Sequence, residues 1–190
     1  MDNNTLERRS IWNDAARSGL VLGLVAIVYM VVSTLMSRIQ ASGAGAAVLN
    51  VSGIILWVAK IYLCIYLMKV FMTRFASRYD EVTNADSFRF GMYTALLSAL
   101  LYSGFYLAWV LFIQPDMFQE SIDAAMQMYE NIFTESQLEQ MEQLVPKMPS
   151  MSFFFNLVWC WLFGTVVAAI LSRNIPPRNP FFEDSGSDQQ

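Results

Sequence analysis

The sequence predicts an all-α membrane protein with four transmembrane helices and an extracytoplasmic helical hairpin between helices three and four. Three observations lead to this prediction. Only 15% of the 190 residues are charged, whereas soluble domains have about 25%. Four apolar runs are each long enough to cross a bilayer. Basic residues gather in the segments that flank these runs on one side.

The four predicted spans are the clearest feature of the chain. About 20 apolar residues cross the roughly 30 Å hydrocarbon core, and a helix satisfies its own backbone groups in lipid. The runs are apolar on every face, which argues against the alternating strands of a β-barrel. Three of them carry no charge, and the second contains only Lys60. The spans lie at about 18–36, 48–68, 91–113 and 151–171.

The flanking charges predict the orientation. Nine basic residues lie on one side of the four spans and two on the other, so the positive-inside rule puts both chain ends in the cytoplasm. The nine are Arg8, Arg9, Arg17, Lys69, Arg74, Arg78, Arg89, Arg173 and Arg178, and the two are Arg38 and Lys147.

A cleaved signal peptide is the alternative for the first run, because basic residues precede it and the small residues 44–46 follow it. We favour an uncleaved span, since the run is longer than the usual 7–15 residues of a signal peptide. Arg38 also separates the run from the small residues.

We predict that residues 114–150 form an acidic extracytoplasmic insert within a transmembrane domain of residues 1–172. Apolar residues recur at helical intervals, Pro115 suits a first helical turn, and Thr134 with Gln137 matches a capping box. These features predict two short helices. Seven acids invite a cation-site interpretation, but no calcium-loop pattern is present and we favour a solvated face. Residues 173–190 are expected to be a flexible cytoplasmic tail.

Small residues mark candidate packing faces, because helices in lipid associate where their backbones can approach closely. The third span has such residues at four-residue spacing, and the first span has a shorter stripe. These faces serve either a dimer interface or packing within the four-helix bundle, and we favour packing within the bundle. The candidate residues are Gly91, Ala95, Ala99, Ser103, Gly19 and Gly23.

Lys60 is the best single candidate for a polar site. A cationic side chain at mid-membrane costs about 2.5–3.5 kcal/mol on insertion scales. The four spans contain no Asp or Glu to pair with it. Lys60 therefore is a polar point in a substrate or ion pathway, or a charge that attracts an anion, or a structural lysine that snorkels or forms a hydrogen bond inside the bundle. Its possible polar neighbours are Tyr29, Ser33, Ser98, Tyr102, Ser103, Asn156 and Thr165.

Composition and motifs exclude several function classes. The chain has no histidine, which removes His-based metal sites and His-dependent catalytic triads. A net charge of −4 argues against a nucleic-acid partner. No nucleotide-binding loop or hydrolase motif is present. We therefore expect no cofactor, no metal and no enzymatic activity. We also expect Cys64 and Cys160 to be free thiols.

Four short segments carry a family resemblance. They are WNDAARSG (12–19), SFRFG (87–91), IQPD (113–116) and SRNIPP (172–177). With these segments the chain resembles small bacterial membrane proteins catalogued as domain of unknown function 4199, found mostly in Bacteroidota. The resemblance implies a four-span protein of the bacterial inner membrane with a helical outward insert. It implies no activity.

Two functional classes remain. We favour a non-enzymatic integral membrane protein that acts through protein contacts in the membrane, as a homo-oligomer or with another membrane protein. The alternative is a small transporter or channel component that uses Lys60. Four spans are few for a complete transporter, so this alternative requires oligomerisation.

Overall fold

The computed structural model describes residues 8–37, 39, 44–79, 82–129 and 135–175. Four helices in these ranges are long and apolar enough to cross a membrane, as the sequence predicts. Shorter helical segments join the third long helix to the fourth. The elements are α1 (Arg8–Ser37), α2 (Ala44–Arg78), α3 (Asn84–Ala108), η1 (Trp109–Ile113), α4 (Pro115–Tyr129), α5 (Glu135–Leu144), η2 (Val145–Lys147) and α6 (Met148–Asn174).

The long helices extend beyond the apolar runs. The 35 residues of α2 correspond to about 52 Å of helix, against a hydrocarbon core of roughly 30 Å. The residues from Lys69 to Arg78 therefore continue the helix past the apolar run instead of forming a loop. Arg17 likewise lies within α1, which begins at Arg8. Rigid helix thus carries several of the flanking charges.

Local hydrogen bonds explain where α3 starts and how it ends. Thr83 and Asp86 form a capping box, in which the Asp86 amide donates to Thr83 Oγ1 at 3.2 Å and the Thr83 amide donates to Asp86 Oδ2. At the other end, the Gln114 amide donates to the Trp109 carbonyl, five residues back. This bond closes the π-helical turn η1, and Pro115 then begins α4. The Thr134 cap predicted for the next helix lies outside the described residues.

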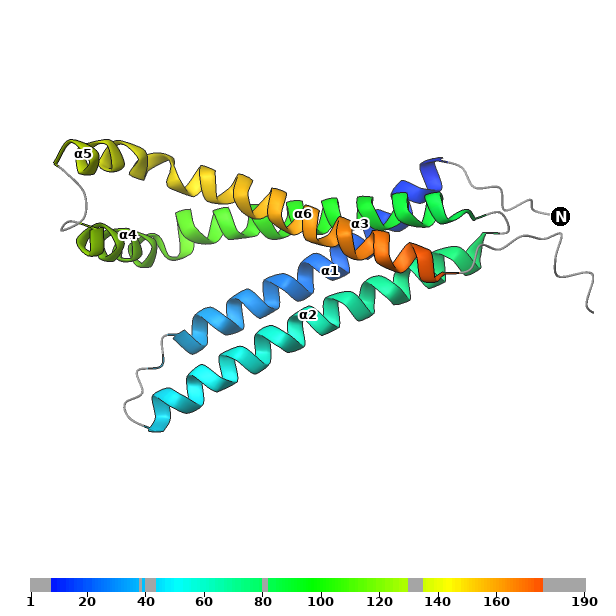
Figure 1. Ribbon diagram of the computed structural model, residues 1–190, viewed down its shortest axis with the longest axis horizontal. Coiled ribbons are helices and arrows are strands. Elements are labelled where there is room, and N and C mark those ends of the chain that lie inside the picture. The colour runs from blue at the N-terminus through cyan, green and yellow to red at the C-terminus, as the bar shows by residue number, and fades with distance from the viewer. Residues whose placement is uncertain (1–7, 38, 40–43, 80–81, 130–134, 176–190) are drawn as a thin grey trace, which may run out of the picture.

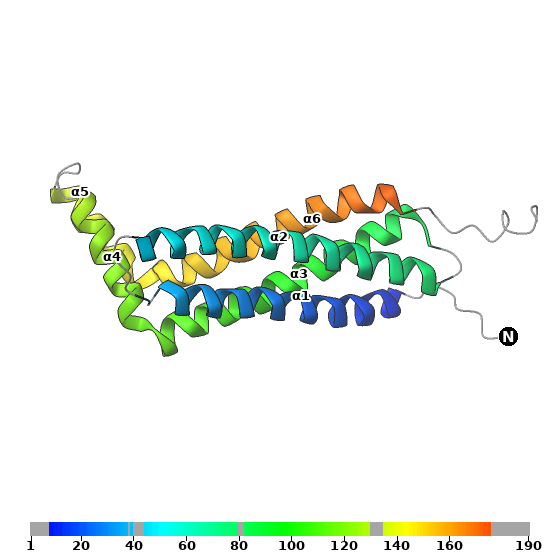
Figure 2. The same ribbon diagram turned by 90° about the horizontal axis from the view of Figure 1, so that it is seen from below.

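The four long helices run alternately up and down (Figure 1). α3 packs extensively against α1 and α6, whereas α2 lies mainly beside α1. The start of α1, the end of α2, the start of α3 and the end of α6 lie together at one end (Figures 1 and 2). Towards the opposite end the α1–α2 pair diverges from α3 and α6, and α4 and α5 extend the α3–α6 side (Figure 1).

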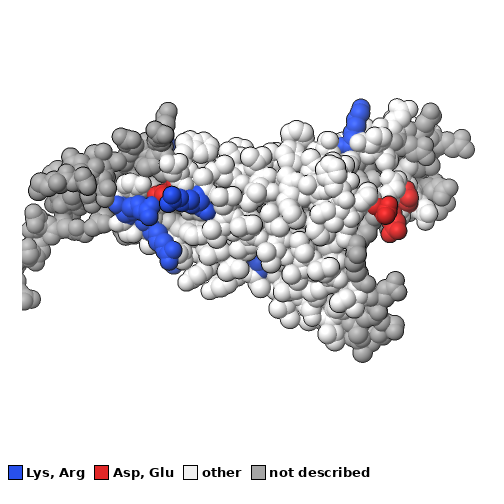
Figure 3. Space-filling view, turned by 180° about the vertical axis from the view of Figure 1, so that it is seen from behind, with Lys and Arg blue, Asp and Glu red and all other residues white. Residues whose placement is uncertain are grey.

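Charge distinguishes the two ends of the bundle. Most Lys and Arg gather at one end of the face in Figure 3, and acidic residues lie near the other. We call these the basic end and the far end. Among the basic residues whose side chains the structure describes, Arg17, Lys69, Arg74, Arg78, Arg89 and Arg173 lie towards the basic end.

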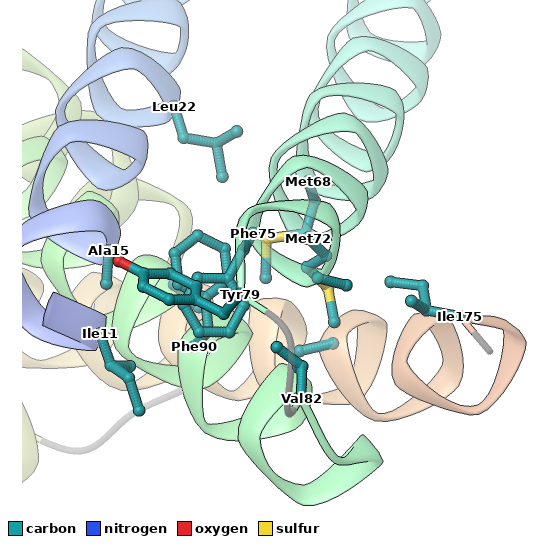
Figure 4. Close-up of a cluster of buried hydrophobic side chains, with 13 residues drawn as sticks. Ile11, Ala15, Leu22, Met68, Met72, Phe75, Tyr79, Val82, Phe90 and Ile175 are labelled. Carbon is teal, nitrogen blue, oxygen red and sulfur yellow. The ribbon is translucent and has the colours of Figure 1, made fainter. Parts of the chain in front are cut away.

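The buried core lies towards the basic end (Figure 4). Met68, Met72 and Phe75 recur at helical spacing, so one face of α2 turns inward against α3 and α1. Phe75 stacks on Phe90 of α3 with ring centroids 4.4 Å apart and an interplanar angle of 6°. Phe90 is 1% exposed and Met72 is 0% exposed. This packing fixes α2 at its basic end only, because the far half of α2 is largely exposed.

Candidate site around Lys60

Lys60 points into the bundle and not away from it. Its Nζ lies 4.7 Å from the centroid of the Tyr29 ring on α1 and 5.4 Å from that of Tyr102 on α3. Each such cation–π contact is worth about 0.5–2 kcal/mol, depending on desolvation. Two of them offset much of the roughly 2.5–3.5 kcal/mol that a charge costs at mid-membrane. Aromatic faces thus stabilise the ammonium where the spans offer no carboxylate.

The ion pairs formed by the described side chains all lie at the basic end, far from Lys60. They join Arg78 to Asp14 and Arg89 to Asp86. Within the described part of the chain, Lys60 therefore has aromatic neighbours and no ion-pair partner. Its positive charge is available to an anion that reaches it.

Two thiols complete the surroundings of Lys60. Cys64 lies one turn further along α2, and Cys160 comes from α6. Both thiols are free, and both lie within electrostatic range of the Lys60 ammonium. All four long helices therefore contribute to one group, which we call the Lys60 cluster: Lys60, Tyr29, Tyr102, Cys64 and Cys160. No group of three His, Cys, Asp or Glu side chains that could hold a metal occurs among the described residues.

A cavity of about 570 Å³ lies between α1 and α2 on the far side of the Lys60 cluster. Its volume is within the roughly 300–1,000 Å³ typical of small-molecule sites. Tyr29 lines the cavity and also carries the Lys60 ammonium on its ring. Tyr29 therefore lies between the cavity and the Lys60 ammonium, and Lys60 itself is not part of the lining. Its lining is Tyr29, Ser33, Met36, Ile39, Leu49, Asn50, Gly53, Ile54, Leu56 and Trp57.

The other candidate neighbours of Lys60 have different roles. Asn156 Nδ2 donates to the Ser152 carbonyl, and Thr165 Oγ1 donates to the Trp161 carbonyl, so each side chain forms a hydrogen bond to its own helix. Ser33 lines the cavity. The Ser103 hydroxyl is buried and has no hydrogen-bond partner among the described residues. Of the seven candidates, Tyr29 and Tyr102 contact Lys60, through their rings and not their hydroxyls.

The candidate packing residues lie where helices cross within the chain. A Cβ built on Gly91 would be 2.6 Å from Ala168 Cβ of α6, and one on Gly19 would be 2.9 Å from Leu97 Cβ of α3. A Cβ on Gly23 would approach Leu101 of α3 at 2.7 Å. The remaining members of the stripe, Ala95, Ala99 and Ser103, are all buried.

One polar contact at the basic end was not predicted from the sequence. Arg78 Nη1 donates to both carboxylate oxygens of Asp14, at 2.8 and 2.9 Å, and the Tyr79 hydroxyl donates to the same carboxylate at 3.2 Å. The partners are 64 and 65 positions apart. The only sequence signal for this contact is that an acid stands among basic residues at a predicted helix entrance.

One protein family matches most of the chain. The profile described as "Protein of unknown function (DUF4199)" matches residues 17–173. The chain belongs to the DUF4199 family. In this DUF4199 protein the match begins within α1 and ends within α6, and it includes all of α2 and α3, the Lys60 cluster and the cavity beside it. Comparison with curated proteins finds no match, and comparison with solved structures finds none either.

Proposed function

We propose that this DUF4199 protein is a non-enzymatic membrane protein that binds a small anionic amphiphile beside Lys60, as a component of a transporter or channel. The observation that supports this most is the Lys60 ammonium, held inside the bundle over two tyrosine rings next to a cavity. A structural lysine that snorkels would instead extend its ammonium towards a membrane surface.

The chemistry of the cavity suggests which ligand it takes. Most of its lining is apolar, and Ser33 and Asn50 add polar groups towards the far end. The positive charge lies past Tyr29, one turn along α2 from Leu56 and Trp57. An apolar tail with one negative head matches such a lining, since the tail would contact the walls and the head would contact Lys60.

The proposal is tested with dansyl-labelled undecanoate as the probe and full-length protein in neutral lipid nanodiscs. We expect saturable fluorescence enhancement with the wild type. Lys60→Met should weaken binding at least tenfold because the cationic partner of the carboxylate is lost, and Lys60→Arg should largely retain it. The methyl ester of the probe should bind the wild type and Lys60→Met alike.

Lys69→Met is the matched control, because it removes a lysine from the same helix at an exposed position outside the cavity. It should leave probe binding within twofold of the wild type. If Lys60→Met binds the carboxylate probe as tightly as the wild type does, or if both methionine variants lose binding equally, the proposal is wrong.

The topology is part of the same proposal. We propose a location in the bacterial inner membrane, with both chain ends in the cytoplasm and α4 and α5 as the extracytoplasmic hairpin. The positive-inside rule supports this orientation, because the basic end carries Arg17, Lys69 and Arg74 among its charges. The cavity beside Lys60 would then open in the extracytoplasmic half of the membrane.

Protein contacts in the membrane are a second candidate function, supported by the far half of α2. Val51, Ile55 and Trp57 are 55–62% exposed there, and a Cβ on Gly104 of α3 would meet nothing within 4 Å. Open glycines and a loosely packed helix suit a neighbouring transmembrane helix, either from another protein or from a second copy. Crosslinking in native membranes, followed by mass spectrometry of the purified adducts, should then give a specific partner through α2. Recovery of the monomer alone would contradict this candidate.

A further inference from the structure

The basic end contains a second cavity that neither the Lys60 cluster nor the proposed function uses. It measures about 170 Å³ and lies between α1 and α2, with one side chain from α3. We call it the arginine cavity. Its lining is Asp14, Arg17, Ser18, Phe71, Arg74, Phe75, Arg78 and Phe90.

The lining has a surplus of two positive charges. Asp14 is engaged by Arg78 and by the Tyr79 hydroxyl, which leaves Arg17 and Arg74 without a carboxylate partner among the described side chains. Asp14 therefore fixes one guanidinium at the edge of the cavity, while two others remain free to donate. Guanidinium groups bind phosphate oxygens through paired, charge-assisted hydrogen bonds.

One side of the cavity is apolar and formed by two buried phenylalanine rings. Phe75 and Phe90 are 3% and 1% exposed, and their rings stack on each other. The cavity thus combines guanidinium groups with aromatic rings. This combination is complementary to a lipid at the level where its charged headgroup meets its acyl chains. The volume is below the roughly 300–1,000 Å³ of ordinary small-molecule sites, so it suits a single phosphate group better than a whole metabolite.

The depth of the cavity matches that boundary. Phe71 and Arg74 lie just beyond Met68, where the second apolar run ends. If this run fills the hydrocarbon core, Arg74 lies about 9 Å further along the helix, at headgroup level. Basic pockets between transmembrane helices are suited to anionic lipid headgroups at this depth. We propose that the arginine cavity is a specific site for the phosphate of an anionic phospholipid.

The test uses the full-length chain in neutral detergent, titrated with phosphatidylglycerol or phosphatidylcholine, with bound lipid counted by native mass spectrometry. Phosphatidylglycerol should bind at least fivefold more tightly than phosphatidylcholine. The double variant Arg17→Gln/Arg74→Gln should lose this preference. The matched double variant Lys69→Gln/Arg173→Gln removes the same charge at the same end without touching the cavity lining, and it should stay within twofold of the wild type.

Ser18→Leu keeps every charge and fills the cavity, so it should also lose the preference for phosphatidylglycerol. This variant keeps the proposal testable if the double arginine variant fails to fold. Inorganic phosphate provides the other arm of the test. If millimolar phosphate displaces the lipid completely, the site recognises the free anion and the lipid proposal is wrong. The proposal is equally wrong if Lys69→Gln/Arg173→Gln loses as much of the preference for phosphatidylglycerol as Arg17→Gln/Arg74→Gln does. Overall charge would then explain the effect.

Discussion

At the basic end the four long helices pack around stacked aromatic rings, whereas in the far half the α1–α2 pair diverges from α3 and α6 (Figure 1). The change along α2 is clear. Met68, Met72 and Phe75 are at most 3% exposed, whereas Val51, Ile54 and Ile55 are 56–63% exposed. The same helix is therefore a core element at one end and an exposed element at the other.

This difference separates the part that holds the helices together from the part that is open to ligands. Lys60 lies between the two halves of α2, and the larger cavity lies in the half with fewer interhelical contacts. A ligand entering between α1 and α2 would not have to break the stacked core. The smaller arginine cavity lies against the core itself, so its shape is fixed by Phe75 and Phe90.

The largest expected effect is the loss of a core ring at the basic end. Phe90→Ala removes a side chain that is 1% exposed and stacked on Phe75, so we expect a loss of about 3–5 kcal/mol in the free energy of unfolding. Phe112→Ala is the far-half control, because Phe112 is 82% exposed. It should cost less than about 1 kcal/mol.

Reversible unfolding of both phenylalanine variants in mixed micelles, followed by tryptophan fluorescence, measures this contrast. Similar losses for the two variants would mean that the far half is as closely packed in the membrane as the basic end. The distinction between the two halves would then be wrong.

The sequence predicted the four long helices because each contains an apolar run long enough to cross a bilayer, and Lys60 is the only charge within these runs. It did not predict the core at the basic end, because Met72, Phe75 and Tyr79 are interspersed with arginines and an apolar run does not reveal them. Their four- and three-residue spacing is the signal that was available. The far end of the second predicted span is instead the more exposed half of α2.

The site was only partly accessible from sequence. Lys60 stands out because a lone charge in an apolar run is costly. Its aromatic partners depend on how α1, α2 and α3 are rotated about their axes, and seven polar residues were equally eligible. The pairing of Asp14 with Arg78 depends on the meeting of two helix ends that are 64 positions apart. No local sequence pattern predicts a contact between residues so far apart.

The smaller effects concern two glycines of α3, one in each half. A Cβ on Gly91 would lie 2.6 Å from Ala168 Cβ, which cannot rotate away, so α3 and α6 would have to separate. Gly91→Ala should therefore cost about 1–3 kcal/mol of unfolding free energy, even though alanine is the better helix former. Gly104→Ala meets nothing within 4 Å, and it should stabilise the protein by about 0.5–1 kcal/mol through the lower backbone entropy of its unfolded state.

Opposite signs for the same chemical change on one helix are a sharper test than either value alone, because detergent and membrane environment affect both variants alike. Both are measured by the same unfolding titration as the phenylalanine pair. If Gly91→Ala stabilises the protein as Gly104→Ala does, then α3 and α6 do not approach each other closely at Gly91. If Gly104→Ala destabilises it instead, a helix from a second copy or a partner occupies the space beside Gly104, and the far half is an interface.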